Sequence, residues 1–525
     1  MPDHLQHEDA LAMLHELADT GLLVPLEFAP VEATGSDQGP VTRLIIPTRD
    51  RTALVTRLAD LVATAAPTTP PAIFIVDDSD SPSGPTPSSN TNPSANASTA
   101  TNMTESVVPH HIRLDDRLSP DGPFAAVHRS SVPPEAIRFA LLGDRRCPPS
   151  LGAMRNTNYL LGAGQRVVTM DDDTVALGFR TALPGAPIHY TGSRDEPVFE
   201  FYRDRETLLS QHELAPLDPI ALTVEWLGRR VPGPDSDLSE VTPELFHQLT
   251  HHKPTIDVVC HGTIGDGGIG VRQFVLQATG EQRERFMATE DRYRVSTTSR
   301  EMTRFATSPT VLAHPYLMST VMGLDCTVLL PPSYPYGRGD EGLFAAMIHH
   351  LFNDSLILQA PTAFLHSPPD DATHRAAPWF TELPLRVCWL LQIILNTYPK
   401  PPGGTRADRL ICFGEWLRAH SARLSEGEFA DWIESTVFHT RAGYYRSLEE
   451  LLDRYEGSPE YWAEDVLKLQ ANVRAQLAGG HLGPVEEFKP LSLSREDEYC
   501  LLKTHFASYA EVLMSWPEIC RVMQA

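Results

Sequence analysis

The chain has 525 residues, 42% of them apolar, so it is long enough for two to four domains and can bury a substantial core. Its formal net charge of −25 argues against nucleic acid and against anionic lipid held by a general basic surface, although a metal ion and a few local arginines can still hold a nucleotide in an acidic protein. The seven cysteines are scattered and show neither a disulfide nor a zinc pattern, which predicts reduced thiols. The N-terminus lacks the order of a signal peptide, and no apolar run is long enough to span a membrane. We therefore expect a cytoplasmic protein, and peripheral association with a membrane is left open.

The first expected elements are a helix and the start of an α/β sheet. Leucines at helical spacing predict a helix over residues 8–24, within an N-terminal segment 1–40. An apolar strand closed by a proline turn spans Leu44–Arg51, a helix is expected over 52–64, and a second strand that ends in two aspartates spans Ile73–Ser79. This β-α-β order predicts an α/β sheet with right-handed crossovers.

An insertion follows the second strand. Residues 79–106 are almost wholly Ser, Thr, Pro, Asn, Ala and Gly, which bury too little apolar surface to offset the entropy of ordering, so we expect a disordered insertion. A helix is expected over 134–142, and another begins at Gly152–Asn158 and leads to the central strand.

The central strand ends in three consecutive carboxylates. Val167–Met170 is apolar and is followed by Asp171, Asp172 and Asp173, a pattern typical of a buried parallel strand whose carboxyl end faces a cleft. Adjacent carboxylates repel one another unless a cation or hydrogen-bond donors neutralise them. In an extended segment Asp171 and Asp173 share a face while Asp172 points away, so this pair is a candidate site for Mg²⁺ or Mn²⁺. The alternative is an acidic loop that binds no metal.

Strands and helices alternate after the triplet. The expected elements are a strand at Asp257–Cys260, a glycine-rich stretch at 265–270, a helix at 315–322, a helix through 345–352 and a strand at 355–359. Asp340 and Glu341 open the helix that continues through 345–352, where the helix dipole favours their charged forms.

Beyond about residue 375 the sequence becomes helical in character. Aromatic residues and leucines recur at three- and four-residue spacing between charged faces, as at Trp389, Ile393 and Trp416. This pattern predicts four to seven helices over 375–525, and homo-oligomerisation through them is left open.

Taken together, these landmarks resemble the family 2 glycosyltransferases of the GT-A fold. The matching elements are Ile45–Arg51 (the opening strand and turn), Ile75–Ser79 (the acidic end of the second strand), Arg155-Asn156 (an Arg-Asn pair), Asp171-Asp172-Asp173 (the DXD element), Gly339–Phe344 (the later acidic element) and His366 (the histidine of galactofuranosyltransferase-like members). Each motif is weak alone, but their order is that of the family. The resemblance implies an α/β, Rossmann-like GT-A domain over 41–374, interrupted at 79–106, and an α-helical C-terminal domain over 375–525.

The resemblance also implies an activity and its site. It implies a metal-dependent transfer of a sugar from a nucleotide-diphosphate donor, expected to be a UDP-sugar, to an acceptor that the sequence does not identify. Inversion is expected and retention stays open. The metal, Mn²⁺ or Mg²⁺, would be held by Asp171, Asp173 and His366, and a carboxylate-imidazole set favours Mn²⁺. His366 can also be read as an ordinary loop histidine.

The same resemblance places further residues on the donor and the acceptor. The residues implied for donor binding are Pro47, Thr48, Arg49, Arg51, Asp77, Asp78, Arg155, Asn156 and Asp172. The base that takes the acceptor proton is Glu341 or Asp340. The second acidic residue of the family element aligns with Glu341, but this chain reverses the usual order of the pair, so both stay candidates.

Two other functions share this pattern. A nucleotidyltransferase has the same architecture, but the turn in Leu44–Arg51 lacks the glycines that such an enzyme needs around a triphosphate. A degenerate GT-A domain that serves as a binding scaffold is the second alternative, and the retention of every acidic landmark disfavours it.

Overall fold

The computed structural model describes residues 40–49, 71–79, 109–147, 149–193, 196–233, 236–268, 273–314, 317–318, 320–368, 384–399, 403–479 and 483–525. The helices expected at 8–24 and 52–64, Arg51 and nearly all of the 79–106 insertion lie outside these residues and stay predictions.

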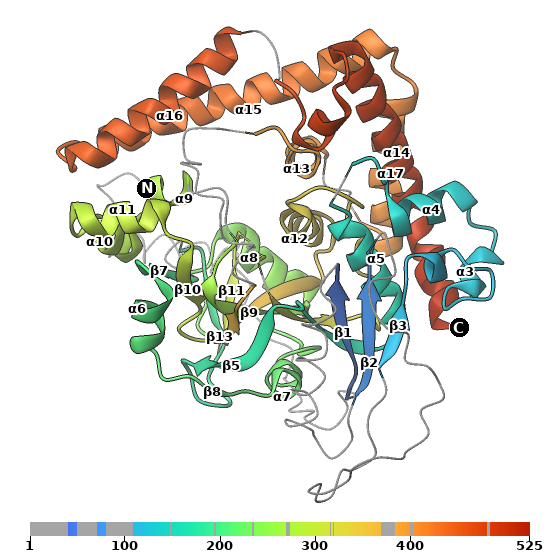
Figure 1. Cartoon of the computed structure of the whole chain (residues 1–525), viewed down its shortest axis with the longest axis horizontal. Coiled ribbons are helices and arrows are strands. Elements are labelled where there is room, and N and C mark those ends of the chain that lie inside the picture. The colour runs from blue at the N-terminus through green and yellow to red at the C-terminus, as the bar shows by residue number, and fades with distance from the viewer. Residues whose placement is uncertain are drawn as a thin grey trace, which may run out of the picture.

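Thirteen strands among the described residues form one mixed sheet at the centre of the protein (Figure 1). The main path across it has the order β3-β2-β1-β4-β12-β9-β13-β11-β6. Along that path the strands span His110–Ile112, Ala72–Asp77, Val41–Thr48, Arg166–Met170, Val321–Asp325, Thr255–Asp266, Ser355–His366, Thr310–Leu312 and His189–Thr191. The strands off the path are β5 (Thr174–Arg180), β7 (Val198–Phe201), β8 (Ala215–Pro216) and β10 (Glu301–Phe305).

Several strands run in one direction and end at one edge of the sheet. β1 is parallel to β2 and to β4, and β9 is parallel to β13. β12 is antiparallel to both β4 and β9, which makes β4 and β9 parallel to each other. The carboxyl ends of β1, β2, β4, β9 and β13 therefore meet at the same edge, called the carboxyl edge below, where α/β proteins bind their ligands. The expected α/β class and its two opening strands are confirmed.

Helices cover both faces of the sheet. In β1, Ile45 belongs to the core formed with α4 (Pro134–Leu142), α5 (Leu151–Leu161) and α12 (Asp340–Leu351). Its neighbours Leu44 and Ile46 pack with α7 (Pro219–Val224) on the opposite face, because side chains alternate along a strand. The helices expected at 134–142, from Gly152 and through 345–352 are confirmed.

Shorter helices connect the strands. They are α3 (Ala125–His128), α6 (Arg205–Ser210), α8 (Pro243–His247), α9 (Gln273–Leu276), α10 (Gly280–Met287), α11 (Glu290–Thr298), η1 (Asp115–Arg117) and the π-helical η2 (Gln248–His252).

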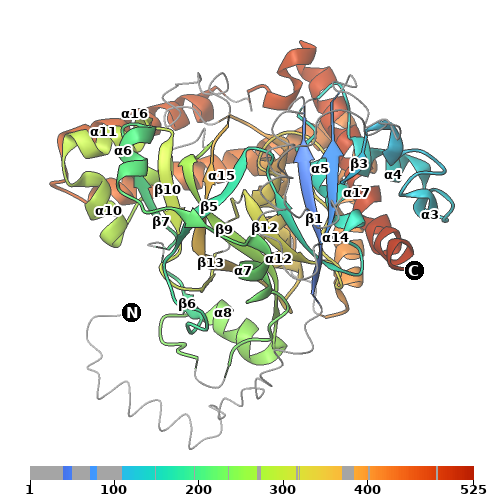
Figure 2. The same cartoon turned by 60° about the horizontal axis from the view of Figure 1, so that its bottom comes forward.

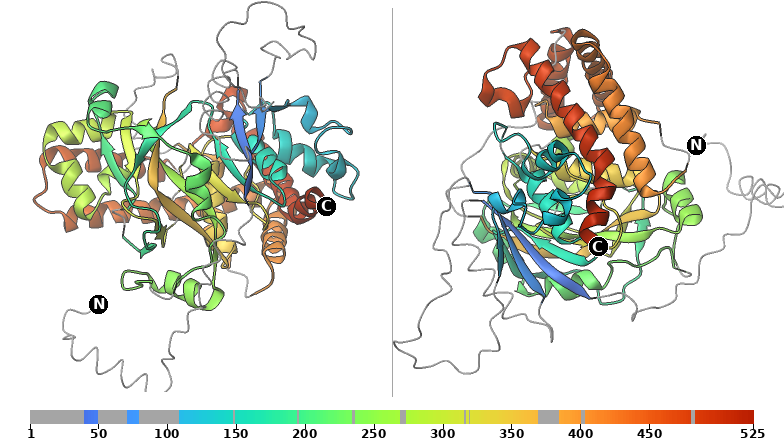
Figure 3. Two further views of the ribbon diagram at one scale, coloured as in Figure 1. Left: turned by 90° about the horizontal axis from the view of Figure 1, so that it is seen from below. Right: turned by 90° about the vertical axis from the view of Figure 1, so that its right-hand side faces the viewer.

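The described part of the C-terminal region is helical, as expected. Its helices are α13 (Val387–Thr397), α14 (Arg406–Ala422), α15 (Glu426–Arg454), α16 (Glu460–Ala478), η4 (Glu486–Leu491) and α17 (Arg495–Gln524). α17 runs beside α14 to the C-terminus (Figure 3). Buried residues of α13, α14 and α17 form one continuous core with those of α5 and α12, so these helices pack directly on the sheet domain. The boundary at 374/375 stays a prediction. None of the described helices combines the length and apolar character that a membrane crossing requires.

The hairpin of α15 and α16 holds the segment between β9 and β10. α10, α11 and α16 lie together at the end of the molecule away from β1 and β3 (Figure 2). The guanidinium of Arg283 in α10 stacks on the rings of Tyr455 and Trp462, 3.9 and 4.1 Å from their centroids. The indole Nε1 of Trp462 donates to the carbonyl of Leu276, 3.0 Å away. The C-terminal helices therefore fix the segment that follows the carboxyl end of β9.

One expected element is wrong and two are longer than expected. The helix expected over 315–322 is contradicted, because Val321 and Met322 open β12. All five residues of β12 are buried between β4 and β9, and a fully buried strand shows no alternation that separates it from a helix. The strands expected at Asp257–Cys260 and 355–359 continue as β9 and β13 to Asp266 and His366, at the carboxyl edge.

Candidate functional site

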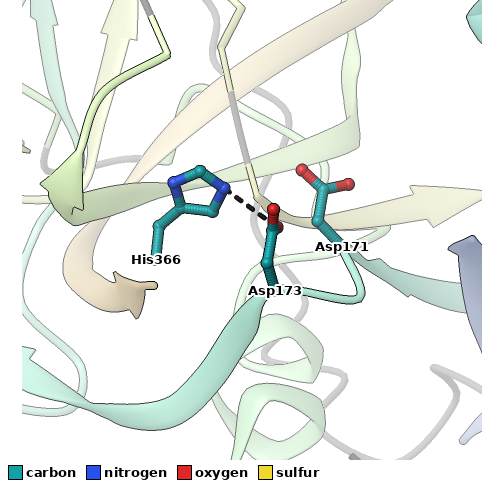
Figure 4. A group of neighbouring side chains, drawn as sticks. All are labelled: Asp171, Asp173 and His366. Atoms are coloured by element: carbon teal, nitrogen blue, oxygen red, sulfur yellow. Dashed lines mark ion pairs between the residues drawn. The ribbon is translucent and has the colours of Figure 1, made fainter. Parts of the chain in front are cut away.

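Two carboxylates and an imidazole meet at the carboxyl edge. One ligand atom each of Asp171, Asp173 and His366 all lie within 4.8 Å of one another (Figure 4). Asp171 directly follows β4, and Asp173 directly precedes β5. His366 is the last residue of β13, and it pairs in register with Thr174, the first residue of β5. Elsewhere in the described part of the chain, no other three such side chains are grouped closely enough to hold a metal ion.

The acidic triplet forms a turn rather than an extended segment. The amide of Thr174 donates to the carbonyl of Asp171 (3.1 Å), whose own amide donates to the carbonyl of Thr320 (2.8 Å). The turn places Asp171 and Asp173 together. Asp172 is directed to β1, where its Oδ2 accepts a hydrogen bond from Thr48 Oγ1 (2.7 Å). The expected grouping is therefore found, but a turn causes it and strand alternation does not.

The backbone of β9 orients the imidazole. His366 Nδ1 donates to the carbonyl oxygen of Asp266 (2.5 Å), and Nε2 lies 2.9 Å from Asp173 Oδ1. Burial lowers the pKa of a histidine, but the hydrogen bond and the charge of Asp173 outweigh it and raise the pKa of His366 to about 9. Both ring nitrogens thus carry protons. Loss of the Nε2 proton would leave that nitrogen facing Asp173 as a ligand, with the ring held by Asp266.

Asp171 is an unfavourable place for a negative charge. Burial is the largest cause and the charge of Asp173 the next, and together they raise the pKa of Asp171 to about 8, although Arg155 and His366 act in the opposite direction. A cation bound here would relieve both effects. Two carboxylate oxygens and one imidazole nitrogen suit Mn²⁺, and Mg²⁺ less well. The donor set therefore fits a divalent metal ion.

Arg155 joins the helix before the triplet to the later acidic pair. Its Nε donates to Asp340 Oδ2 (2.5 Å) and one terminal nitrogen, NH2, donates to Glu341 Oε1 (2.7 Å). The two carboxylates occupy the first turn of α12, which begins after Gly339, a glycine with a φ of 95°. The charges of Arg155 and Glu341 also act on the pKa of Asp171, so this pair and the triplet belong to one electrostatic site.

Asp78 is buried in a cluster of arginines at the end of β2. Its carboxylate lies 3.0 Å from Arg117, 3.2 Å from Arg145 and 4.0 Å from Arg49, in each case measured to the NH1 atom, and it also accepts from Ser150 Oγ. Its side chain is fully buried. Asp78 therefore fixes the loops around the ends of β1 and β2.

The remaining donor-binding candidates occupy different environments. Asp77 is partly exposed, and its Oδ1 accepts from the amide and hydroxyl of Ser79 (2.9 and 2.5 Å). Pro47 lies within β1 in register with Val76. Asn156 is fully buried: its Nδ2 donates to the carbonyls of Ala140 and Ser333, and its Oδ1 accepts from the amide of Ser333. The structure thus does not bring Asn156 to the carboxyl edge.

The structure adds residues that sequence reasoning missed. Asp266 supplies the carbonyl that orients His366, and its carboxylate makes two bonds with Arg300 (3.0 and 2.8 Å). The amide of Ser367 donates to the carbonyl of Asp173 (2.8 Å), and Arg205 donates to the hydroxyl of Ser367 (3.4 Å). Asp266 lies in the glycine-rich stretch at 265–270, and nothing in the sequence assigned it a role or assigned the arginines to their partners.

Comparisons with known proteins do not assign the chain. No protein-family model and no curated protein sequence matches it. Among solved structures it is similar to a mannosyltransferase from Pyrobaculum calidifontis, in complex with GDP-Man and Mn²⁺, over 90% of this chain and 95% of that one, at 12% sequence identity and a TM-score of 0.30. A likeness at this identity and TM-score decides neither family nor activity, which are inferred below from the site.

Proposed function

We propose that the chain is a metal-dependent glycosyltransferase with a GT-A domain similar to family 2. It would transfer a sugar from a nucleotide-diphosphate donor to an acceptor, with inversion at the anomeric carbon. The observation that carries the proposal is the meeting of Asp171, Asp173 and His366 at the carboxyl edge, close enough to Arg155 and Glu341 for their charges to interact. Three metal-ligand side chains, a guanidinium and a carboxylate are the groups that the reaction needs.

The two carboxylates and Nε2 of His366 would hold Mn²⁺ or Mg²⁺. When bound, the ion supplies Lewis-acid stabilisation of the negative charge that develops on the diphosphate leaving group. Asp266 keeps the imidazole in place through its carbonyl, and Thr48 keeps Asp172 turned toward β1.

The donor nucleotide is proposed to lie at the ends of β1 and β2. Asp77 is partly exposed there and can accept from a nucleobase, whereas Asp78 is buried among its arginines. Arg49 has a side chain 29% exposed, so it can face a ligand while it remains near Asp78. A UDP-sugar remains the proposed donor. The acceptor, whether glycan, lipid-linked, peptide or small molecule, is not assigned.

Glu341 is the better candidate for the base. Its side chain is 20% exposed, whereas that of Asp340 is 4% exposed and holds Arg155 through its Oδ2. In the reaction the acceptor oxygen forms a bond to the anomeric carbon as the bond from that carbon to the phosphate oxygen breaks. The acceptor proton passes to Glu341, and the nucleoside diphosphate leaves with the electron pair.

A thermal-shift screen tests the proposal. Nucleoside diphosphates and their sugars are added with and without Mn²⁺ to the wild type, to Asp173→Asn and to Asp431→Asn, a matched control at an exposed position on α15. We expect one nucleotide class to stabilise the wild type and the control only when Mn²⁺ is present, by about 2.7 kcal/mol at a hundred times its Kd. Asp173→Asn should lose this response.

The other outcomes separate the alternatives. Stabilisation by a nucleoside triphosphate but not by diphosphate sugars would favour the nucleotidyltransferase. No response to any nucleotide would favour the scaffold. An equal response of Asp173→Asn and the wild type would refute the assigned metal ligands.

A further inference from the structure

Arg155 interacts with two acidic parts of the site, the carboxylates of Asp340 and Glu341 on one side and Asp171 on the other. In the described structure it is paired with Asp340 and Glu341 on α12, at 2.5 and 2.7 Å. It also acts through its charge on Asp171, on the metal side of the site. A guanidinium has a planar fork of N–H donors and stays charged at every physiological pH, so it can serve two anions at once.

Only part of that fork is used by the protein. The bonds to the acidic pair engage Nε and the NH2 nitrogen, and within the described residues NH1 donates to no protein acceptor. The Arg155 side chain is 20% exposed, so the unused side of the guanidinium is not sealed by the core. Phosphate oxygens are the anions that such a fork binds best, because two parallel N–H donors match their spacing.

Glu341 cannot act efficiently as a base while Arg155 holds it. A guanidinium at 2.7 Å stabilises the ionised carboxylate and makes it a weaker proton acceptor. A base in this condition would leave water unactivated whenever the donor site is empty.

We propose that Arg155 is a positioning residue that couples donor binding to the base: it restrains Glu341 in the free protein and shares its charge with the donor diphosphate once that is bound. This inference rests on the proposed function. Asp340, the more buried partner, keeps the guanidinium anchored through Nε in both states. Glu341 is the partner whose bond weakens, and its carboxylate then accepts the proton of the acceptor hydroxyl.

A double-mutant cycle on nucleotide binding tests this coupling. Calorimetric titration measures the affinities of UDP and GDP at saturating Mn²⁺ for the wild type, Glu341→Gln, Arg155→Gln and the double variant. Because Glu341 competes with the diphosphate for Arg155, Glu341→Gln should tighten binding by about fivefold, the upper end for a partly exposed ion pair. Arg155→Gln should weaken binding, and in that background Glu341→Gln should have no further effect.

Controls separate this effect from a general loss of charge or of fold. Arg418→Gln removes an arginine from an ion pair with Glu511 between two C-terminal helices, 3.3 Å long, and should leave nucleotide affinity unchanged. Mn²⁺ binding without nucleotide is measured for every variant, because the charges of Arg155 and Glu341 also act on the pKa of Asp171, and nucleotide affinities are compared only at Mn²⁺ concentrations that saturate each variant. If Arg155→Gln does not fold, the cycle uses Arg155→Lys, whose point charge cannot bridge both carboxylates.

Different results would overturn the coupling and the proposed function. Weaker or unchanged binding by Glu341→Gln, or an equal gain in both backgrounds, would overturn the coupling while the wild type still binds nucleotide with Mn²⁺. No binding of either nucleotide to the wild type would instead overturn the proposed function, and the coupling with it.

Discussion

Binding of Mn²⁺ should depend steeply on pH, because two protons occupy the proposed site. The pKa of Asp171 is raised to about 8 by burial and by Asp173, and the pKa of His366 is raised to about 9 by Asp173 against the effect of burial. At pH 7 both groups are protonated, and a cation held by them must displace both protons.

The expected magnitude follows from the distance of each pKa from pH 7. Protonation of Asp171 weakens the apparent affinity by about tenfold and that of His366 by about a hundredfold, so the loss at pH 7 is on the order of a thousandfold. Between pH 7 and 8 the affinity should rise by roughly fiftyfold. The two groups interact, so the titration belongs to the pair rather than to either residue.

Calorimetry in buffers of different ionisation enthalpy measures both the affinity and the protons released. We expect nearly two protons per Mn²⁺ at pH 7, and about one in Asp171→Asn or His366→Gln, each of which retains one titrating group. The matched control Asp431→Asn should behave as the wild type. An affinity that is flat from about pH 6.5 to about 8.5, without proton release, would refute the assigned ligands.

The same groups make the metal-free protein less stable at higher pH. Both bind their proton more tightly in the folded than in the unfolded chain, where the ordinary pKa values are 3.8 and 6.5. The stabilisation is complete below those values and is lost as the pH rises through about 8 for Asp171 and about 9 for His366. Each group contributes a slope of about 1.4 kcal/mol per pH unit. Denaturant unfolding from pH 6 to 9 should show this decline, and Asp171→Asn should reduce it.

Three further outcomes are expected. Gly265→Ala should destabilise the fold by about 1–3 kcal/mol and weaken Mn²⁺ binding, because φ at Gly265 is 104° and an added Cβ would lie 2.5 Å from the carbonyl oxygen of His366. The control is Gly185→Ala, where φ is 76° and the space around the residue is open. It should lower the free energy of unfolding by less and leave metal affinity unchanged. Arg283→Gln removes the guanidinium stacked on Trp462 and should lower the free energy of unfolding by about 1–2 kcal/mol, measured in urea; an unchanged free energy of unfolding would contradict a stabilising stack. Chelation of Mn²⁺ should abolish the thermal stabilisation by nucleotide, and stabilisation that survives excess chelator would contradict a metal-bridged diphosphate.

The local parts of the site could be predicted from the sequence. An apolar run that ends in carboxylates indicates both a buried strand and the residue at which that strand ends. The sequence therefore predicts β2 and β4, with Asp77 and Asp171 at their carboxyl ends. The first turn of α12, with Asp340 and Glu341, was visible for the same reason. His366 was reached only through the family resemblance, because the seven further residues of β13 beyond Gln359 carry no separate signal.

The pairing of charges could not be predicted. Arg155 lies 185 positions from Asp340 in the sequence, and Arg145 lies 67 positions from Asp78. No local pattern specifies which carboxylate an arginine will meet over such distances. The family resemblance therefore assigns Arg155 only to donor binding, whereas in the structure its guanidinium is paired with Asp340 and Glu341.

The kind of countercharge beside each acidic group at the carboxyl edge gives a physical reason to place the proposed metal site at Asp171 and Asp173. Near the carboxyl edge, carboxylates paired with guanidinium groups include those of Asp78 (Arg117, Arg145 and Arg49), Asp266 (Arg300) and Asp340 with Glu341 (Arg155). Asp173 is paired instead with an imidazole. An arginine keeps its proton at any pH that the protein survives, so its carboxylate stays neutralised and has no need of a metal. A histidine can give up its proton and offer the freed nitrogen as a ligand, which converts the neutralising group into part of the binding site. In a chain of net charge −25, this difference favours Asp171 and Asp173 over the arginine-paired carboxylates as the proposed place of a divalent cation.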